Sequence, residues 1–442
     1  MVFLSALLLA GCAGGASKVV PAAAGSGNGG DTVTGVVNRL TGAPVAFGTQ
    51  IPACAVPQPG REQCHSIIVA LGVVGPGKVG TSASSRAIRS YPGGAPYIPM
   101  DLWTAYNTYL DAVYSGSGHS IWIVDAYDDP TAEADLQIYR NAFNLPTCST
   151  ANGCFHKYNQ DGVVGRYPPP DPAGGSGWAV ETSLDLDMVS AMCPHCNINL
   201  VEANDNTTTN LYHAAGVLAA SAHPDAISMS FGHVERLSDQ QLSLDQFFSS
   251  GANPPGAGGN LFIASSGDSG GTVGPNYPAI SQYVMSVGGT TLNRSVGSAR
   301  LFTETAWSGT GGGCSKFEPK PAWQVDQNCG FRFGNDISAV ADPNTGVFVY
   351  DSYLAPLGQQ WVVVGGTSVS APLIAGIVGV ALNGQSITNN YMYTHTAALN
   401  DIVSGNNGSG GTYCLAQTYY CTAAPGQDGP TGWGTPNTIG AL

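Results

Sequence analysis

One stretch of the chain constrains its fold more than any other: residues 362–380, with the sequence VVVGGTSVSAPLIAGIVGV. A β-branched run, a Gly-Gly-Thr turn and an apolar segment with small residues at helical spacing predict a strand, a tight turn and a buried helix. Ser368 then lies at the helix N-terminus, where unpaired N–H groups and the helix dipole stabilise the negative charge that develops when a hydroxyl attacks a carbonyl. Ser is also a preferred helix cap, so a purely structural role stays open at this point.

Strands and helices alternate through the middle of the chain. The predicted strands are 66–74, 120–125, 198–202, 226–231 and 260–265, and the predicted helices are 101–109, 130–143, 181–192, 210–222 and 238–248. This order indicates an α/β fold with a mostly parallel central sheet flanked by helices. Binding and catalytic sites in such folds lie at the carboxyl ends of the strands. Asp125, Ser230, Asp268 and Ser368 fall at such ends.

The composition indicates a compact, loop-rich globular protein. Apolar residues make up 43% of the chain and charged residues 10%, with 60 glycines, which is unlike a disordered sequence. The 29 acidic residues exceed the 15 basic ones, so the formal net charge is −14. A chain this acidic is not expected to bind nucleic acid.

The first residues, MVFLSALLLAGC, form an apolar run that resembles the lipobox of bacterial lipoproteins, although the basic residues typical of a signal peptide are missing. We therefore expect residues 1–11 to be a lipoprotein-type signal peptide and a lipidated Cys12 to tether an extracytoplasmic protein. Residues 12–50 are rich in Gly, Ala, Val and Ser, which predicts a flexible linker. No later apolar run approaches the ~20 residues that a membrane span needs.

Ten of the eleven cysteines form five close sequential pairs, which leaves Cys12 unpaired. Short-range pairing is the economical prediction, and it implies an oxidising compartment. The pairs are Cys54/Cys64, Cys148/Cys154, Cys193/Cys196, Cys314/Cys329 and Cys414/Cys421. The Cys193/Cys196 pair is alternatively half of a zinc site, but no second CxxC or His pair lies at a ligand-like spacing.

Two carboxylates lie on one face of a predicted helix. Glu181 and Asp185 are four residues apart, so they share a helix face in weakly charged, Trp-rich surroundings. The alternative is an ordinary solvated face. A third carboxylate, Asp268, follows a strand within Gly-Asp-Ser-Gly-Gly, the string around the nucleophile of chymotrypsin-like proteases. Those enzymes need two antiparallel barrels and a characteristic histidine context; neither is present, so Ser269 is a weak candidate.

A nucleophilic Ser368 requires a base, and histidine is the usual one. The His-Gly-Thr-His context of subtilisin-like enzymes is absent from this sequence. One alternative keeps a Ser/His/Asp arrangement, with Asp125 and an unrecognised histidine such as His213. We instead predict that a carboxylate accepts the proton.

Several ordered motifs resemble those of the sedolisin family of serine-carboxyl peptidases, over roughly residues 95–442. They are the Gly-Gly-Thr-Ser that ends at Ser368, the Glu-x-x-x-Asp of 181–185, the Ser-Gly-Asp of 266–268 and the strand 228–232. Similar stretches are 124–130, 277–279, 287–290, 338–342 and 432–436. The resemblance implies a subtilisin-like fold and an endopeptidase that acts on proteins or peptides.

The resemblance also implies a role for each catalytic residue: Ser368 as nucleophile, Glu181 as general base, Asp185 as its orienting partner and Asp268 as oxyanion-hole donor. A carboxyl group donates a hydrogen bond to an oxyanion only while it is protonated, as in the ketosteroid isomerase case. An unperturbed Asp, with a pKa near about 3.9, is almost fully ionised at neutral pH. We therefore expect activity in mild acid.

The family carries a calcium site near its C-terminus, and two stretches here resemble it. Asp401 and Asp428 would supply carboxylates, and Ile402, Ala424 and Gly426 would supply backbone carbonyl oxygens. Hard oxygen ligands without Cys or His suit calcium. Ala424 and Gln427 depart from the residues usual in the family, and a Gly-rich surface loop is the alternative.

These inferences predict a lipid-tethered or secreted bacterial endopeptidase, expected to be monomeric. Its peptidase domain spans residues 95–442, with substrate along the strand 228–232. Residues 51–94 form a short N-terminal segment that is not a full prodomain, so either activation needs no such segment or the region around Cys54 and Cys64 replaces it. The rival from another class is a catalytically silent binding protein with a peptidase fold.

Overall fold

The computed structural model describes residues 32–37, 44–46, 48–69, 96–172, 177–221, 224–241, 243–249, 260–326, 329–353, 360–381, 387–408, 414 and 417–442. Its central sheet has the strand order β14-β13-β11-β9-β6-β8-β7, with β17 also paired to β13. These strands are β6 (Ser120–Ala126), β7 (Phe155–Asn159), β8 (Asn197–Ala203), β9 (Ala226–Met229), β11 (Phe262–Ser265), β13 (Val284–Arg294), β14 (Phe302–Ala306) and β17 (Ile337–Val340). All neighbours pair in parallel except β13 and β14. The predicted α/β fold with a mostly parallel sheet is confirmed.

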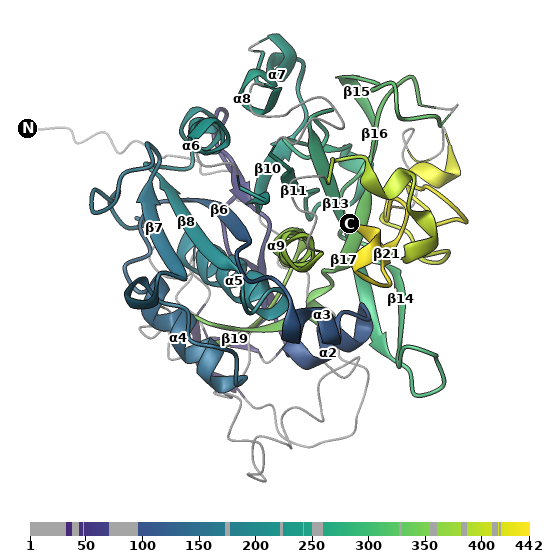
Figure 1. Ribbon diagram of the computed structural model, residues 1–442. Coiled ribbons are helices and arrows are strands. Elements are labelled where there is room, and N and C mark those ends of the chain that lie inside the picture. Colours follow the sequence, from purple (N-terminus) through teal and green to yellow (C-terminus); the bar gives the residue numbers. More distant parts are fainter. Residues whose placement is uncertain are drawn as a thin grey trace, which may run out of the picture.

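Two buried helices at the centre of the molecule carry the core (Figure 1). They are α5 (Trp178–Met192) and α9 (Thr367–Val380), and every residue of both is buried. The helices pack against each other, and α9 also contacts five of the central strands. Around them lie α2 (Pro99–Ala105), α3 (Tyr109–Tyr114), α4 (Ala132–Ala142) and α6 (Thr208–Ser221). Since α5 is buried on all sides, its carboxylates do not form the solvated face that was the alternative.

The predicted strand 226–231 is divided in two. It becomes β9 and β10 (Phe231–Val234), and the break falls at Ser230. Strand β10 leaves the central sheet and pairs with β4 (Gln63–Cys64) and β12 (Asn276–Tyr277). The backbone carbonyl of Ser230 accepts bonds from His65 N–H and Ser368 Oγ, so this break turns polar backbone groups toward the site instead of into the sheet ladder.

The predicted helix 238–248 is likewise replaced by two short helices, α7 (Leu237–Gln241) and α8 (Gln246–Ser249). Ser243 between them has φ 50°, a left-handed conformation that a continuous α-helix does not contain. The predicted helix 101–109 is also interrupted, by Asn107 at φ 54° between α2 and α3. Other predicted elements differ mainly at their ends.

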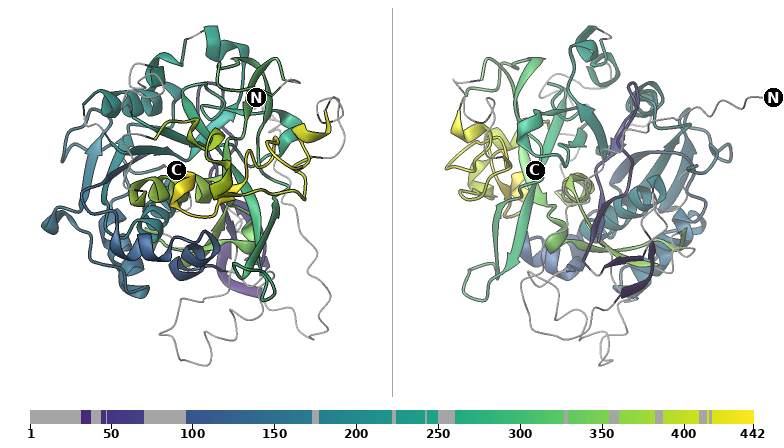
Figure 2. Two further views of the ribbon diagram at one scale, coloured as in Figure 1. Left: turned by 45° about the vertical axis from the view of Figure 1, so that its right-hand side comes forward. Right: turned by 180° about the vertical axis from the view of Figure 1, so that it is seen from behind.

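Residues 48–69 pair with strands that lie beyond the predicted domain boundary at residue 95. Strand β5 (Ile67–Val69) lies between β3 (Gln50–Pro52) and β19 (Trp361–Gly365) in the order β18-β19-β5-β3, where β18 is Val347–Tyr350. In the view from behind, this purple segment runs beside α9 (Figure 2). Within the predicted linker 12–50, β1 (Thr32–Val37) and β2 (Pro44–Ala46) form a small antiparallel pair. Residues 1–31, with the predicted signal peptide and Cys12, lie outside the described residues.

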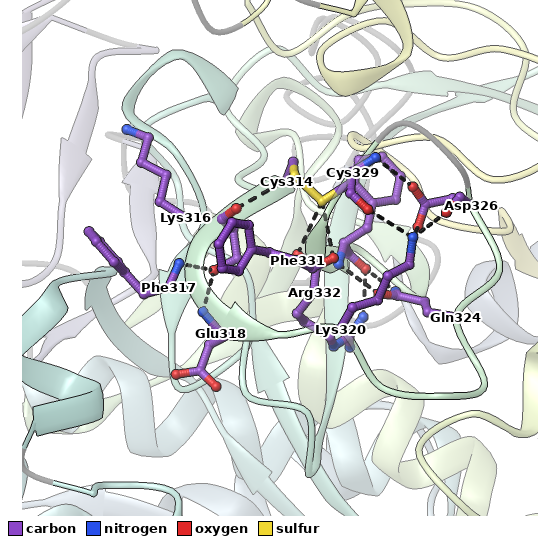
Figure 3. Close-up of a disulfide and its surroundings, with 12 residues drawn as sticks. Cys314, Lys316, Phe317, Glu318, Lys320, Gln324, Asp326, Cys329, Phe331 and Arg332 are labelled. Carbon is purple, nitrogen blue, oxygen red and sulfur yellow. Dashed lines mark hydrogen bonds and ion pairs between the residues drawn. A yellow bond between two sulfur atoms is a disulfide. The ribbon is translucent and has the colours of Figure 1, made fainter.

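All five predicted cysteine pairs are disulfide-bonded. Cys193 and Cys196 are bonded to each other and therefore offer no thiolates to zinc. The Cys314–Cys329 bond joins β15 (Gly313–Pro319) to the loop before β16 (Phe331–Gly334), where Asp326 accepts from Cys329 N and pairs with Lys320 (Figure 3). Over the described part of the chain, no helix is long and apolar enough to cross a bilayer.

The close contact between α9 and α5 depends on glycine in α9. A Cβ at Gly376 would lie 2.7 Å from Cβ of Met192 on α5, which is closer than side chains pack. Gly376→Val should therefore lower the free energy of unfolding by about 1–3 kcal/mol, the usual range for overpacking a core. Urea denaturation measures it. Gly297→Ala is the control, since a Cβ there meets nothing within 4 Å; equal stability of the two variants would contradict this account of the contact.

Candidate active site

Ser368 is the second residue of α9, directly after the tight turn that follows β19. The turn requires glycine because Gly366 has φ 104°, a conformation that other residues avoid. Ser368 is completely buried. Its hydroxyl donates to the Ser230 carbonyl at 3.3 Å, and its backbone N–H donates to the His65 carbonyl at 3.0 Å.

Helix α5 presents Glu181 and Asp185 to this serine. Both side chains are completely buried. One oxygen of Asp185 accepts from Ser230 Oγ at 2.7 Å, and Ser230 Oγ also lies 3.5 Å from the Ser368 carbonyl oxygen. Ser230 therefore links the second carboxylate of the helix to the nucleophile's backbone, and the structure brings Glu181, Asp185 and Ser368 together as predicted.

The environment of Glu181 favours its protonated form. Burial raises its pKa well above the ordinary value, and the nearby Asp125 carboxyl raises it further, whereas the hydroxyls of Ser368 and Ser66 lower it. The two hydroxyls are thus neighbours of the carboxyl group, although no described residue forms a well-aligned hydrogen bond to either Glu181 oxygen. When Glu181 is ionised, its oxygens are placed to accept a proton from the serine beside it.

Asp125 completes a cluster of three buried carboxyl groups. It lies at the end of β6, is fully buried, and has a pKa raised to about 8 by burial, against a lowering contribution from the Thr182 hydroxyl. Its charge in turn raises the pKa of Asp185. Adjacent carboxyl groups cannot all ionise in a dry site, so the cluster holds protons in mild acid.

Asp268 is held against the turn that carries the nucleophile. Its Oδ1 accepts from the backbone N–H of Thr367 at 2.8 Å and from the Thr367 hydroxyl at 2.9 Å. Its Oδ2 is buried and has no hydrogen-bond partner among the described residues. Burial raises the pKa of Asp268 to about 7, against the Thr367 hydrogen bonds that lower it. The group is therefore protonated in mild acid, when Oδ2 is able to donate.

The two alternative assignments do not form sites. Ser269 is exposed beside Asp268. His213 lies on α6 with its side chain 41% exposed, and pairs with Asp161 at 3.0 Å. The predicted Asp125/His213 arrangement is therefore not assembled.

Sequence reasoning did not assign His65, Ser66 or Thr367 to the site. Thr367 could have been assigned to the site from the sequence, because it directly precedes Ser368 in a segment predicted to follow a strand. Nothing in the pattern around His65 and Ser66 predicts their position, because their contact with α9 depends on strand pairing between distant segments.

The predicted calcium ligands lie in two neighbouring loops. Asp401 Oδ2 accepts from Gly426 N at 2.9 Å, and Asp428 Oδ2 accepts from Ala424 N at 2.8 Å. Asp428 is buried; burial raises its pKa to about 7, and the Asp401 charge adds to this. Among the described residues, no group of three or more His, Cys, Asp or Glu side chains is placed to hold a metal ion, so a cation here would depend on backbone oxygens as well.

Comparison with known proteins identifies the family of this chain. The model of the subtilase family matches residues 174–434, more than half of the chain. The chain is 29% identical to kumamolisin of Bacillus sp. (strain MN-32) over 382 residues, covering 78% of this chain and 63% of that protein. It is 28% identical to sedolisin of Pseudomonas sp. (strain 101) over 339 residues, covering 68% and 53%. The chain thus spans between about half and two thirds of the length of these relatives.

A solved structure of Pseudomonas sedolisin, a serine-carboxyl proteinase complexed with pseudo-iodotyrostatin, superposes with a TM-score of 0.63 at 27% identity. It covers 79% of this chain and 96% of that one. The chain therefore belongs to the subtilase family. Its relatives confirm the more specific resemblance to the sedolisin type of serine-carboxyl peptidase.

Proposed function

We propose that the protein is an endopeptidase that hydrolyses peptide bonds of proteins in mild acid, through an acyl-enzyme on Ser368. The observation that carries this proposal is that the buried hydroxyl of Ser368 lies beside buried carboxyl groups of α5. A carboxyl oxygen of Asp268 also has no hydrogen-bond partner among the described residues. Membership of the family supports a serine peptidase. The roles of the individual residues and the acidic pH range of activity are part of this proposal.

The first half of the reaction uses Ser368 and the surrounding carboxyl groups. Glu181 accepts the proton of Ser368 as the serine oxygen attacks the substrate carbonyl. Asp185 and Asp125 share the remaining protons of the carboxyl cluster. The oxyanion receives hydrogen bonds from the Ser368 backbone N–H and from protonated Asp268. Donors already in place in a dry site stabilise the developing charge without reorganisation.

The second half regenerates the serine. Glu181 returns the proton to the leaving amine, which departs as the new N-terminus. Water then attacks the acyl ester while Glu181 again accepts a proton, and Glu181 passes this proton to Ser368 Oγ as the product acid is released. No histidine is required, because carboxyl groups with raised pKa values exchange protons in this range.

Replacing the proposed base tests this assignment. Glu181→Gln keeps the shape of the side chain but removes the proton acceptor, so we expect kcat to fall by about 10²–10⁴ with KM little changed. Cleavage of acid-denatured haemoglobin, with circular dichroism as a folding check, measures it. His213→Ala is the matched control and should retain wild-type activity. Loss of activity in His213→Ala but not in Glu181→Gln would instead support the Ser/His/Asp alternative.

In this proposal, the pKa of Asp268 determines the upper pH limit of activity. Its pKa is raised to about 7, so the donor form is present below that pH and is lost as the pH rises through it. The pKa of Glu181 is raised above 4.5, so its basic form disappears as the pH falls. Activity should be lost on the acid side as Glu181 takes up a proton at its raised pKa, and should decline through about pH 7 as Asp268 ionises. In Asp268→Asn the amide donor does not titrate, so the decline near pH 7 should disappear from kcat/KM profiles; an unchanged decline would refute the oxyanion role.

The calcium proposal rests on the C-terminal loops. Among the described residues, none donates a hydrogen bond to the carbonyl oxygens of Ile402, Ala424 or Gly426, and the Asp401 charge opposes ionisation of buried Asp428. Carbonyl oxygens and two carboxylates suit a hard divalent cation. Calcium would neutralise the repulsion between the two carboxylates and join the two loops.

Removal of calcium should destabilise the protein. With EGTA we expect the midpoint of thermal unfolding to fall by several degrees, since saturating a site at about 100 times its Kd contributes about 2.7 kcal/mol. Scanning calorimetry with and without added calcium measures this. Asp401→Ala should abolish the calcium-dependent shift, whereas Asp161→Asn, a surface carboxylate distant in sequence, should retain it. A shift of equal size in both variants would place the cation elsewhere.

The cellular location of the protein is proposed as the sequence predicts it. Five disulfides support an extracytoplasmic location. The lipid tether at Cys12 and the monomeric state are expectations that accompany the proposed function.

A further inference from the structure

One edge of β10, part of the strand predicted to hold substrate, is occupied by the short strand β4. Strand β10 lies between β12 and β4, and β4 pairs with it antiparallel, with Cys64 opposite Phe231 and Gln63 opposite Gly232. Adding an extended strand to a sheet edge is a common way for a protein to hold a peptide. The contacts of β4 therefore show which side chains a peptide in this position would meet.

The register of β4 is fixed relative to Ser368. The His65 N–H donates to the Ser230 carbonyl at 3.2 Å, and the His65 carbonyl accepts from the Ser368 N–H at 3.0 Å. A substrate in the same register places the carbonyl of its scissile bond at this N–H group, which is a proposed oxyanion donor. The residue of the substrate that takes the place of His65 is then the first before the scissile bond, and the residue in the place of Glu62 is the fourth.

Glu62 lies opposite His233 in this pairing. Because Gln63 is opposite Gly232, the next pair of the antiparallel register is Glu62 and His233, and directly opposed side chains have Cβ atoms about 4.5–5.5 Å apart. The Nδ1 atom of His233 is 2.9 Å from Oε2 and 3.1 Å from Oε1 of Glu62. Any peptide that pairs with β10 in this register therefore presents its fourth side chain to His233.

His233 is held as a cation by two carboxylates. Its other ring nitrogen, Nε2, lies 3.1 Å from Oδ1 of Asp239. An ionised carboxylate only accepts hydrogen bonds, so both ring nitrogens carry hydrogen. Although burial lowers the pKa of His233, Glu62 and Asp239 raise it to about 9. Asp239 belongs to α7 and stays in place when a peptide replaces Glu62, so it keeps the ring charged and oriented toward the peptide.

Two residues of α6 complete a pocket around the Glu62 carboxylate. Thr208 Oγ1 donates to Glu62 Oε1 at 2.7 Å. Tyr212 follows one helical turn later, and its buried hydroxyl lies beside Glu62 with no well-aligned hydrogen-bond partner among the described residues. Glu62, His233 and Tyr212 are all buried. An imidazolium and two hydroxyl groups thus surround one carboxylate in a buried site.

This set of groups distinguishes a carboxylate from an amide. A glutamate offers two oxygens that accept hydrogen bonds, whereas a glutamine offers one oxygen and an NH₂ group that the charged imidazole cannot pair with. Hydrogen bonds to charged groups are the stronger ones, and leaving a buried polar group unpaired is costly. An apolar side chain in this place would leave Nδ1 of His233 without a partner.

The carboxylate pocket adjoins the cavity of the candidate active site. His233 and Gly232 line a cavity of about 360 Å³ that is also lined by Asp268 and Ser269. The histidine therefore borders the same space as the proposed oxyanion donor, where a bound substrate would lie.

We propose that His233, with Thr208 and Tyr212, forms a specificity pocket for a glutamate side chain at the fourth residue before the scissile bond, and that Glu62 fills this pocket while β4 lies on β10. The inference rests on the proposed function, which requires substrate to take the place of β4. Because the pocket contacts a side chain remote from the reacting bond, it selects and positions the substrate and takes no part in proton transfer.

Matched peptides test the pocket with the full chain. A bond that wild type cuts in acid-denatured haemoglobin is identified by mass spectrometry, and quenched fluorescent peptides built around it carry either Glu or Gln as the fourth residue before the bond. At about pH 5.5, where a glutamate side chain is mostly ionised, kcat/KM should be about 10- to 100-fold higher for the Glu peptide. A third peptide with Glu moved to the fifth residue should match the Gln peptide.

Variants assign the preference to this pocket. His233→Gln removes the cation and should bring the ratio of kcat/KM for the Glu and Gln peptides close to unity, with the Gln peptide cleaved within about threefold of the wild-type rate. Thr208→Val removes one hydroxyl at nearly constant volume and should lower the ratio in part, which keeps the test valid if His233→Gln does not fold. His213→Gln, the same change at an exposed histidine of α6, should keep the wild-type ratio.

The pH dependence of the preference gives a readout that a purely structural role of His233 would not produce. In wild type the ratio should shrink as the pH falls through about 4.3, because the substrate carboxylate then takes up a proton. The Gln peptide, which does not titrate there, corrects for changes in the catalytic groups.

The outcomes separate this inference from the proposed function. Equal kcat/KM for the three peptides in wild type refutes the pocket and leaves the peptidase assignment standing. An unchanged ratio in folded His233→Gln, or in folded Thr208→Val if His233→Gln does not fold, also refutes it. If folded wild type cuts no bond in haemoglobin, the proposed function fails, and this inference fails with it. Circular dichroism of each variant confirms that the chain is folded.

Discussion

Burial of carboxyl groups without a cationic partner is the physical condition on which this site depends. Glu181, Asp185 and Asp125 are all fully buried. Burial raises their pKa values, and the charges that raise them further belong to other carboxyl groups. Such a cluster is costly for the fold when ionised. The cost falls when the groups keep their protons, so the arrangement is suited to acid and to proton transfer without histidine.

The contact between α5 and α9 creates this condition. Glycine at 376 lets the two helices approach, and the approach places the start of α9 beside the carboxyl face of α5. Thr367 fixes Asp268 with two hydrogen bonds, so the residue before Ser368 positions the carboxyl group of Asp268. Packing and catalysis therefore share the same residues, and neither helix can shift without moving the site.

Much of the fold, and the residues that make up the candidate site, could be predicted from sequence. The Gly-Gly-Thr-Ser turn and the alternation of strands and helices are local patterns, and Glu181 and Asp185 share a face by helix geometry alone. The break at Ser230 could not be predicted, because 226–231 reads as one apolar strand; the polar contacts of Ser230 with Asp185 and Ser368 become visible only in three dimensions. The interruption of the predicted helix at Ser243 could not be predicted either. It depends on a local backbone conformation that hydrophobic periodicity does not reveal.

The sequence by itself determined which chemical groups are available: a serine at a helix start, paired carboxylates on one helix face, an aspartate after a strand, and cysteines spaced for short-range disulfides. Only the tertiary structure decided what surrounds those groups. Burial, which sets their pKa values, is a property of the packed helices, and the position of His65 over Ser368 is a property of strand pairing between residues about 300 positions apart in the chain. Side-chain periodicity is local, whereas desolvation and long-range pairing depend on the whole fold.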